Sequence, residues 1–397
     1  MWFNVIYNID QHNQYKLMKP ILSQYESNSV VCERLNIKPQ TLYAYVSRGL
    51  LRTTADPHDS RKSLYLTEDV DRLLARKTRG RSRQAIAAST IDSGEPILTS
   101  SITEINNGQF YYRGKNALSY SQSASLEQTF CLLCDTPESN LASQLKVETD
   151  SNHRNPFTRM LHITSQECLA AKGLGTKQYA YQLLCKLTSA AAGKPYNSKE
   201  PIHNFLARHW SQDSRAAELI RQALVLSADH ELNASTYASR VATSAGATLA
   251  SSILVGLATL SGTRHGGLTD QCFNWMRKMS KQYDVAKIEL NMPNAKTPAG
   301  FGQPLYPRGD PRATTIIQAC KPRDSWLELV TLIDKTTGKH PSLDFGLATL
   351  EDQLNMKRGS GFGIFAVGRT VGWMAHYFEQ RQSNKIIRPR SSPKTAN

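Results

Sequence analysis

The sequence has no long apolar run, and its first residues are a poor match to a signal peptide. Its longest weakly polar stretch, residues 245–260, is interrupted by Gly, Ser and Thr. It is also shorter than the ~20 apolar residues that a bilayer span needs, so it predicts a buried helix. Residues 1–7 lack a basic leader, a long apolar core and a small-residue cleavage site. We therefore expect a cytoplasmic protein with no membrane partner.

A disulfide framework is also missing. Seven cysteines are an odd number, they are widely scattered, and a chain of 397 residues can bury a core without covalent staples. We expect free thiols. Cys131 and Cys134 have the spacing of a metal-ligand pair, but no second pair accompanies them and two leucines lie between them. A buried helix is the better interpretation, and no metal site is predicted.

Acidic residues are scarce relative to basic ones. The chain has 33 Asp and Glu against 48 Lys and Arg, which gives a formal net charge of +15. Such an excess attracts nucleic acid, anionic membranes or phosphorylated cofactors without choosing among them. The basic run at residues 76–83 leads into a stretch rich in Ala, Ser and Thr, so we place a small first domain at residues 21–80 and a linker at 81–95.

Residues 30–51 predict two short amphipathic helices separated by a tight turn. Pro39 suits a first helical position and Gly49 suits the residue just past a helix end, so the second helix should run over about residues 38–48. The turn-rich residues 52–65 predict a hairpin, or wing.

A third helix is expected over residues 71–79. With it, the order of elements and the sequence of residues 41–51 resemble a MerR-type helix-turn-helix domain, which would place the second helix in the DNA major groove. The resemblance implies base contacts from Gln40, Thr41 and Tyr43, and phosphate contacts from Arg52, Arg61 and Lys62. The alternative is that this small domain packs against its neighbour or mediates assembly.

The rest of the chain predicts a mainly α module. Apolar residues recur there at three- and four-residue spacing. The helical segments are 118–134, 166–191, 214–227, 236–260, 270–279, 324–336, 347–356 and 363–382.

Four loops rich in glycine or proline stand between those helices and carry ionisable residues. They cover residues 228–236, 261–267, 299–312 and 339–345. The glycines beside His265 allow the backbone to approach a ligand closely. A purely structural loop does not need this concentration of His, Arg and Asp, so we expect a functional site there.

Taken in order, these loops resemble the citrate synthase family. The resemblance runs from about residue 97 to residue 390. It is carried by residues 108–114, Asp229–Ser235, Gly262–Gly267, Gly309–Arg312, Pro341–Asp344, Phe365–His376 and 386–390. It implies a large helical domain at 96–265 and 364–397, and a small helical domain at 266–363.

The resemblance implies an acyltransferase of the tricarboxylic acid cycle that condenses acetyl-CoA with oxaloacetate to citrate and CoA. Acetyl-CoA would be a co-substrate, with no permanently bound cofactor. Because a thioester methyl group is a weak acid, the reaction needs a base and a donor to the enolate oxygen. These roles fall on Asp344 and His265. His230, Arg312 and Arg369 fall on oxaloacetate contacts.

Arg388 falls on a substrate contact that the family lends from the other subunit, so the resemblance implies a homodimer. The small residues of the predicted helix up to Leu260 would allow the close packing that a dimer needs. One position departs from the family pattern. The third catalytic residue of the family is a histidine after Gly-Phe-Gly, and this chain has Gln303 there. A glutamine amide donates a hydrogen bond but cannot deliver a proton near neutral pH, so a slow or altered enzyme is expected.

Two further hypotheses stay open. The first, motivated by the N-terminal module together with Gln303, is a ligand-sensing, DNA-binding regulator in which an impaired condensing fold has become a receptor for oxaloacetate, citrate or an acyl-CoA. The chain is also consistent with 2-methylcitrate synthase acting on propionyl-CoA, which no residue of the sequence separates from citrate synthase.

Overall fold

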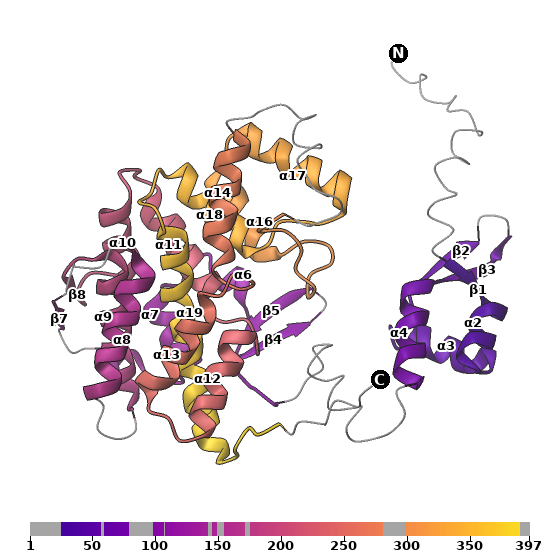
Figure 1. Cartoon of the computed structure of the whole chain (residues 1–397), viewed down its shortest axis with the longest axis horizontal. Coiled ribbons are helices and arrows are strands. Elements are labelled where there is room, and N and C mark those ends of the chain that lie inside the picture. Colours follow the sequence, from indigo (N-terminus) through magenta and orange to yellow (C-terminus); the bar gives the residue numbers. More distant parts are fainter. Residues whose placement is uncertain are drawn as a thin grey trace, which may run out of the picture. The chain divides into compact units, whose positions relative to one another are not determined.

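The structure, a computed structural model, describes residues 25–56, 59–78, 98–106, 108–141, 145–148, 155–170, 175–280 and 298–389. It divides into two compact units, one within the first 99 residues and one at residues 100–390 (Figure 1). Each unit has its own hydrophobic core.

The N-terminal unit is built on a three-stranded antiparallel sheet with strand order β1-β3-β2. Its elements are β1 (Tyr25–Ser27), α2 (Asn28–Leu35), α3 (Pro39–Ser47), β2 (Thr53–Asp56), β3 (Asp59–Leu66) and α4 (Thr67–Thr78). Its core comprises Val31, Leu35, Leu42, Leu51, Tyr65 and Val70.

The order of helices and strands in this unit follows the sequence pattern. Asn36 has a φ of 46°, a left-handed conformation that asparagine tolerates, and it ends α2. Pro39 begins α3, and the bounds of α3 lie within one residue of the prediction. The predicted hairpin is present as β2 and β3. Helix α4 begins at Thr67, four residues before its prediction, and Glu68 and Asp69 in its first turn favour that start.

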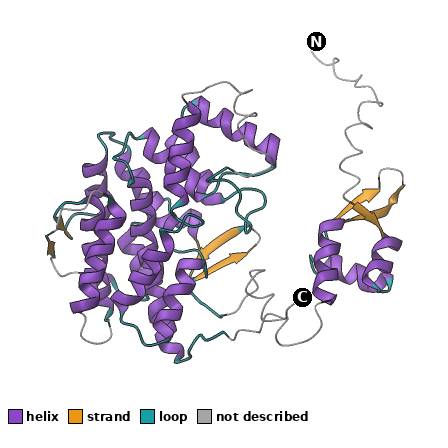
Figure 2. Cartoon of the chain, in the orientation of Figure 1, coloured by secondary structure: helices purple, strands orange, loops and turns teal. Residues whose placement is uncertain are grey.

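The second unit is mainly helical, as predicted (Figure 2). Its helices are α6 (Ala117–Tyr120), α7 (Leu126–Leu133), α8 (Pro156–Ala170), α9 (Lys177–Ala192), α10 (Ile202–Trp210), α11 (Ala216–Ser227), α12 (Ala234–Ser244), α13 (Leu249–Leu260), α14 (Leu268–Ser280), α16 (Pro311–Cys320), α17 (Asp324–Thr337), α18 (Leu343–Gln353) and α19 (Ser360–Ser383), with a 3-10 turn at Glu138–Leu141. Its short strands are β4 (Thr103–Asn106), β5 (Gln109–Tyr112), β6 (Lys115–Asn116), β7 (Lys146–Val147) and β8 (Tyr196–Asn197).

The long helix α19 is the centre of the main core. It packs against α9, α11, α12 and α13, and almost all of its length is buried. Trp373 of α19 lies so close to Gly256 of α13 that a Cβ there would come within 2.7 Å of the indole. A second core joins α14, α17 and α18 around Phe301, Trp326 and Phe345. Figure 1 shows α14, α16, α17 and α18 grouped at one end of the unit.

Three segments predicted as single helices are broken in the structure. Ser125 caps α7 in a capping box with Gln128, and Thr176 and Thr248 cap α9 and α13 with their side chains. These hydroxyls satisfy the free N–H groups of a helix start. Apolar periodicity runs through such breaks because the helices on both sides bury the same face.

Helices α10 and α16 were not predicted. The start of α16 carries a clear signal, because Asp310 caps the helix and Pro311 takes its first position.

Among the helices of the described residues, none is long and apolar enough to cross a membrane. The seven cysteines carry free thiols, and burial raises the pKa of Cys131 to about 11.

Candidate active site

The segment that joins α11 to α12 is held along its length by one face of α19. Arg369 Nε donates to the carbonyl oxygen of Ser227 at 2.9 Å, and the backbone N–H of Gly372 donates to the carbonyl oxygen of Ala228 at 3.1 Å. These contacts orient the next residues of the segment, Asp229 and His230.

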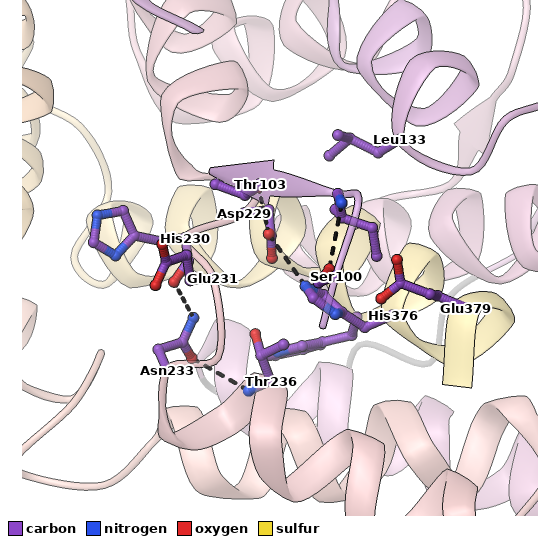
Figure 3. Close-up of polar contacts among 12 residues, drawn as sticks. Ser100, Thr103, Leu133, Asp229, His230, Glu231, Asn233, Thr236, His376 and Glu379 are labelled. Carbon is purple, nitrogen blue, oxygen red and sulfur yellow. Dashed lines mark hydrogen bonds and ion pairs between the residues drawn. The ribbon is translucent and has the colours of Figure 1, made fainter. Parts of the chain in front are cut away.

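Asp229 is anchored from two sides inside the core. Its Oδ2 accepts a hydrogen bond of 2.6 Å from Thr103 and lies 3.2 Å from His376 Nε2 (Figure 3). Burial acts to raise the pKa of Asp229, but the electrostatic interaction and hydrogen bond with His376, together with the charge of Arg369, lower it. The carboxylate is therefore ionised at neutral pH, and it fixes the backbone that carries His230.

His230 lies between two arginines and a tyrosine. Its Nε2 is 2.8 Å from the hydroxyl of Tyr306. Burial, followed by the charges of Arg312 and Arg369, holds the pKa of His230 well below its usual value. The imidazole is therefore neutral, and it serves as a hydrogen-bonding group at this site rather than as a cation.

Arg312 is buried at the start of α16. Its Nε and Nη2 form an ion pair with Asp310 at 2.9 and 2.6 Å, and Asp310 also accepts from the N–H of Leu343. The guanidinium lies 5.8 Å from the centre of the Tyr306 ring. Burial opposes the charge, but the pairing with Asp310 outweighs burial and raises the pKa of Arg312. One edge of the guanidinium, Nε and Nη2, is held by Asp310, and within the described residues Nη1 makes no hydrogen bond.

Arg369 has 1% of its surface exposed. Its guanidinium lies 5.0 Å from the ring centre of Phe365, and burial lowers its pKa to about 10. The side chain still carries a positive charge at neutral pH. Within the described residues only its Nε is hydrogen-bonded, so the remaining N–H groups suit an anionic ligand.

His265 follows α13 and is tied to α12 and α19 through one hydroxyl. Its Nε2 is 2.8 Å from Ser235 Oγ, which accepts from the indole N–H of Trp373 at 3.2 Å. Burial, then the charges of Arg369 and Arg312, lower the pKa of His265 to about 4. The Ser235 hydroxyl donates to Asn233 Oδ1 at 2.8 Å in this structure; in the alternative rotamer it donates to His265 Nε2, and the single proton of the neutral ring then lies on Nδ1, which can donate to a ligand.

The glycines that follow His265 serve packing. A Cβ on Gly266 would lie 2.7 Å from the Leu260 side chain, and one on Gly267 would lie 2.4 Å from the carbonyl oxygen of Ser261. These residues fold the loop back onto the end of α13. The sequence suggested close approach to a ligand instead.

Asp344 is the second residue of α18. Its Oδ1 accepts a hydrogen bond of 2.7 Å from Thr269 of α14. Burial raises the pKa of Asp344 to about 6, although the Thr269 hydrogen bond and the charge of Arg312 act to lower it. A carboxylate with a pKa near the working pH is suited to accept a proton.

Five of the predicted site residues therefore come together in the second unit. Their charges act on one another. Arg312 and Arg369 lower the pKa values of His230 and His265, and the charge of Asp344 acts to raise the pKa of Arg369. Gln303 lies in the neighbouring loop and is partly exposed, and its Oε1 is 3.5 Å from the N–H of Leu305. Arg388 is exposed near the end of the described chain, where the N–H of the preceding Ile387 donates to Ser244 Oγ at 3.0 Å.

The predicted DNA-contact residues divide into two groups. Gln40, Thr41 and Tyr43 are exposed on α3. Each of the three predicted phosphate contacts is paired with an acid of its own unit: Arg52 with Asp69 and Glu68, and Arg61 and Lys62 with Asp59. The sequence could not show this pairing, because the partners of Arg52 are 16 and 17 residues away.

Several residues of the site were not singled out from the sequence. Tyr306, Ser235, Thr269, Asp229, Asp310 and His376 hold the predicted residues in place. Tyr306 carries a signal that could have been read, since it is an aromatic hydroxyl inside the same loop as Gln303. Among the described residues, no group of three or more His, Cys, Asp or Glu could hold a metal ion.

Comparison with known proteins defines the family. Residues 93–390 match the model of the citrate synthase C-terminal domain. The chain belongs to the citrate synthase family. The matched region covers the whole of the second unit.

Curated relatives match at modest identity. Citrate synthase 2 of Bacillus subtilis is 31% identical over 185 residues, which are 44% of this chain and 50% of the relative. The 2-methylcitrate synthase of Mycobacterium tuberculosis is 28% identical over 211 residues, which are 50% of this chain and 54% of the relative. The match thus spans about half the length of the curated citrate synthase family members.

Solved structures share the fold. The citrate synthase of Thermotoga maritima has a TM-score of 0.62 at 22% identity, covering 77% of this chain and 94% of its own. The citrate synthase of Thermoplasma acidophilum, in a ternary complex with carboxymethyl coenzyme A and oxaloacetate, has a TM-score of 0.60 at 19% identity, covering 76% of this chain and 95% of its own. The second unit therefore has the mainly helical citrate synthase fold.

Proposed function

We propose that the second unit condenses acetyl-CoA with oxaloacetate to form citrate and CoA, at a rate limited by Gln303. The observation that carries this proposal is the convergence of His230, Arg312 and Arg369 with a carboxylate whose pKa is about 6. Membership of the citrate synthase family and a structural relative that binds oxaloacetate and a CoA derivative support it.

Oxaloacetate carries two carboxylates, and the two buried arginines supply complementary charge. Arg369 has free N–H groups, and Arg312 is oriented by Asp310. Arginine binds carboxylate through two parallel hydrogen bonds, which fixes orientation as well as charge. His230, neutral and buried between them, would donate or accept a further hydrogen bond.

Enolisation would use Asp344 as the base and His265 as the donor. Asp344 removes a proton from the acetyl methyl group, and the Nδ1–H of His265 donates to the enolate oxygen as charge develops there. The neutral state of His265 suits this role, because its hydrogen bond to Ser235 orients the ring. The enolate carbon then attacks the ketone carbon of oxaloacetate, the ketone π pair moves to oxygen and takes a proton, and water hydrolyses the resulting citryl thioester, which releases CoA and citrate.

We further propose a cytoplasmic homodimer in which Arg388 completes the partner's substrate site. Arg388 is exposed near the end of the described chain, and a residue contributed to a second site has to be exposed in its own chain. The large and small helical domains, at 96–265 with 364–397 and at 266–363, would close over the substrate. Light scattering on the purified full chain measures the mass of the assembly.

The direct test is CoA release from acetyl-CoA and oxaloacetate by the full-length protein. Turnover should be measurable and should be abolished in Asp344→Asn. Absence of turnover with every 2-oxo acid and acyl-CoA tried, together with absence of oxaloacetate binding, would refute the proposal. Propionyl-CoA belongs in the same assay, because a 2-methylcitrate synthase is among the relatives.

A second function is favoured by the first unit. We propose as the alternative a ligand-sensing DNA-binding regulator, whose winged helix-turn-helix unit of MerR type uses the exposed face of α3. Gln40, Thr41 and Tyr43 are exposed there, and Tyr43 has 60% of its surface exposed. A dimer would read two half-sites separated by whole turns of about 34–36 Å.

Gel shifts with genomic fragments and random DNA test this alternative. Gln40→Ala should relax sequence preference, while the matched exposed change Glu33→Ala on α2 should leave it in place. Equal binding to specific and random DNA would rule out the regulator.

A further inference from the structure

The loop that carries Gln303 brings a second polar side chain to the site. The N–H of Tyr306 donates to the carbonyl oxygen of Gln303 at 2.9 Å, so the chain turns between the two residues. Gln303 stays partly exposed, whereas Tyr306 has 3% of its surface exposed. The turn therefore directs the tyrosine inward, three residues after the position where the family carries its histidine.

Tyr306 lies on the face of the site where oxaloacetate is proposed to bind. Its hydroxyl is 2.8 Å from His230 Nε2, and its ring faces the Arg312 guanidinium at 5.8 Å. Both neighbours are among the residues proposed to bind oxaloacetate. The phenol of Tyr306 is thus the neutral O–H group that lies beside these residues in the described part of the loop.

Both members of the Tyr306–His230 pair are neutral. Burial raises the pKa of Tyr306 well above its usual range, against the smaller effect of Arg312. Burial and the two arginines lower the pKa of His230. In the tautomer with the proton on Nε2, His230 donates to the tyrosine oxygen, and the phenol proton is free to point at a third atom.

We propose that Tyr306 donates the hydrogen bond and the proton to the ketone oxygen of the oxo acid, the role that Gln303 cannot fill. This inference rests on the proposed condensation. The enolate carbon attacks the ketone carbon, the new carbon–carbon bond forms, and the carbonyl π pair moves to oxygen. That oxygen takes the Tyr306 proton.

The tyrosinate that remains is stabilised by the His230 N–H and by the Arg312 charge. It regains a proton from solvent when the product leaves, while Asp344 returns to solvent the proton it took from the methyl group. Over one turnover the enzyme therefore neither gains nor loses a proton. Because a phenol is a weaker acid near neutral pH than the imidazolium of a protonated histidine, this arrangement predicts a slow enzyme.

Tyr306→Phe removes the hydroxyl and keeps the ring that packs on His230 and Arg312. We expect it to lower the turnover number by about 10²–10³. Exchange of acetyl-CoA methyl protons with D₂O, measured with malate in place of oxaloacetate, should stay within about threefold of wild type, because enolisation does not use Tyr306. The control is Tyr120→Phe at the end of α6, which should leave both rates unchanged.

Rescue distinguishes proton donation from a structural role. The double variant Tyr306→Phe with Gln303→His should regain most of the turnover lost by Tyr306→Phe, because a histidine at 303 supplies the proton by another route. A structural loss would not be rescued. Turnover of Tyr306→Phe within about twofold of wild type overturns the inference, and so does loss of methyl exchange together with turnover.

A measurement on bound oxaloacetate, which does not depend on turnover, distinguishes a failure of this inference from a failure of the proposed function. The ¹³C signal of [2-¹³C]oxaloacetate bound to the full chain should show a polarised ketone in wild type and lose that shift in Tyr306→Phe. An identical ketone shift in both proteins overturns the role of Tyr306 while leaving the condensation intact. Absence of oxaloacetate binding to wild type overturns the proposed function, and the role of Tyr306 with it.

Discussion

His376 Nε2 lies 3.2 Å from Oδ2 of Asp229, the residue that precedes His230. Neither side chain is exposed. On the other side of the ring, His376 Nδ1 is 3.2 Å from Arg240, which also pairs with Glu379. A polar network inside the helical core therefore holds the segment that presents His230.

Replacing His376 by phenylalanine should destabilise the fold and weaken oxaloacetate binding. The change leaves the Asp229 carboxylate buried with Thr103 as its remaining hydrogen-bond donor. Loss of one partner of a buried pair costs about 3–5 kcal/mol. Urea unfolding and calorimetric titration measure the two effects. Arg381→Ala, an exposed change on α19, is the control, and a His376→Phe protein as stable as this control would contradict the prediction.

Gly372→Ala should act on the same segment through packing. A Cβ there would lie 2.4 Å from the carbonyl oxygen of Ala228 and 2.5 Å from Asp229 Oδ1. We expect a loss of about 1–3 kcal/mol in the free energy of unfolding, as for other overpacked sites. Gly346→Ala on α18 is the matched control, because its nearest neighbour would be 3.3 Å away. Equal losses in the two variants would argue against a role for this close approach.

Ser235→Ala should slow enolisation more than it affects stability. Without the hydroxyl, His265 Nε2 loses its hydrogen-bond partner, and the ring is no longer held in the orientation proposed for donation to the enolate oxygen. Exchange of acetyl-CoA methyl protons should fall by about 10-fold or more. Ser239→Ala on the same helix is the control, since the Ser239 hydroxyl is buried without a hydrogen bond. An exchange rate equal to that of the control would exclude the role of Ser235.

The pH dependence of turnover should follow Asp344. Because burial raises its pKa to about 6, the base form is populated above this pH and is lost below it. Activity should therefore fall about tenfold per pH unit under pH 6. The same shift means that ionisation of Asp344 destabilises the fold as the pH rises from about 4 to 6. Asp344→Asn should thus be inactive yet unfold at a higher temperature than wild type at pH 7. A lower unfolding temperature would contradict this account.

The sequence predicted the elements that depend on local signals. Pro39 and the turn before it set the bounds of α3, and apolar periodicity located α11, α14, α17 and α19. The periodicity missed the break between α12 and α13, because Thr248 starts a new helix without disturbing the apolar face.

For the site, the family pattern pointed to residues, and the fold supplied their neighbours. No local signal connects Asp229 with His376, which are 147 residues apart. The pairing of Arg52 with Asp69 was equally invisible, and it changes the expectation for DNA contact, because a paired arginine has less charge to offer a phosphate.

The hydrogen bonds that hold residues 227–229 against α19 have a consequence for folding during translation. Ser227 and Arg369 are 142 residues apart, so the contact closes a long loop. During synthesis, His230 emerges from the ribosome well before the helix that orients it. Until residues 369–376 have been translated, the nascent chain has no helix to hold His230 and no second arginine for the substrate. Ligand binding thus becomes available only at a late stage of translation.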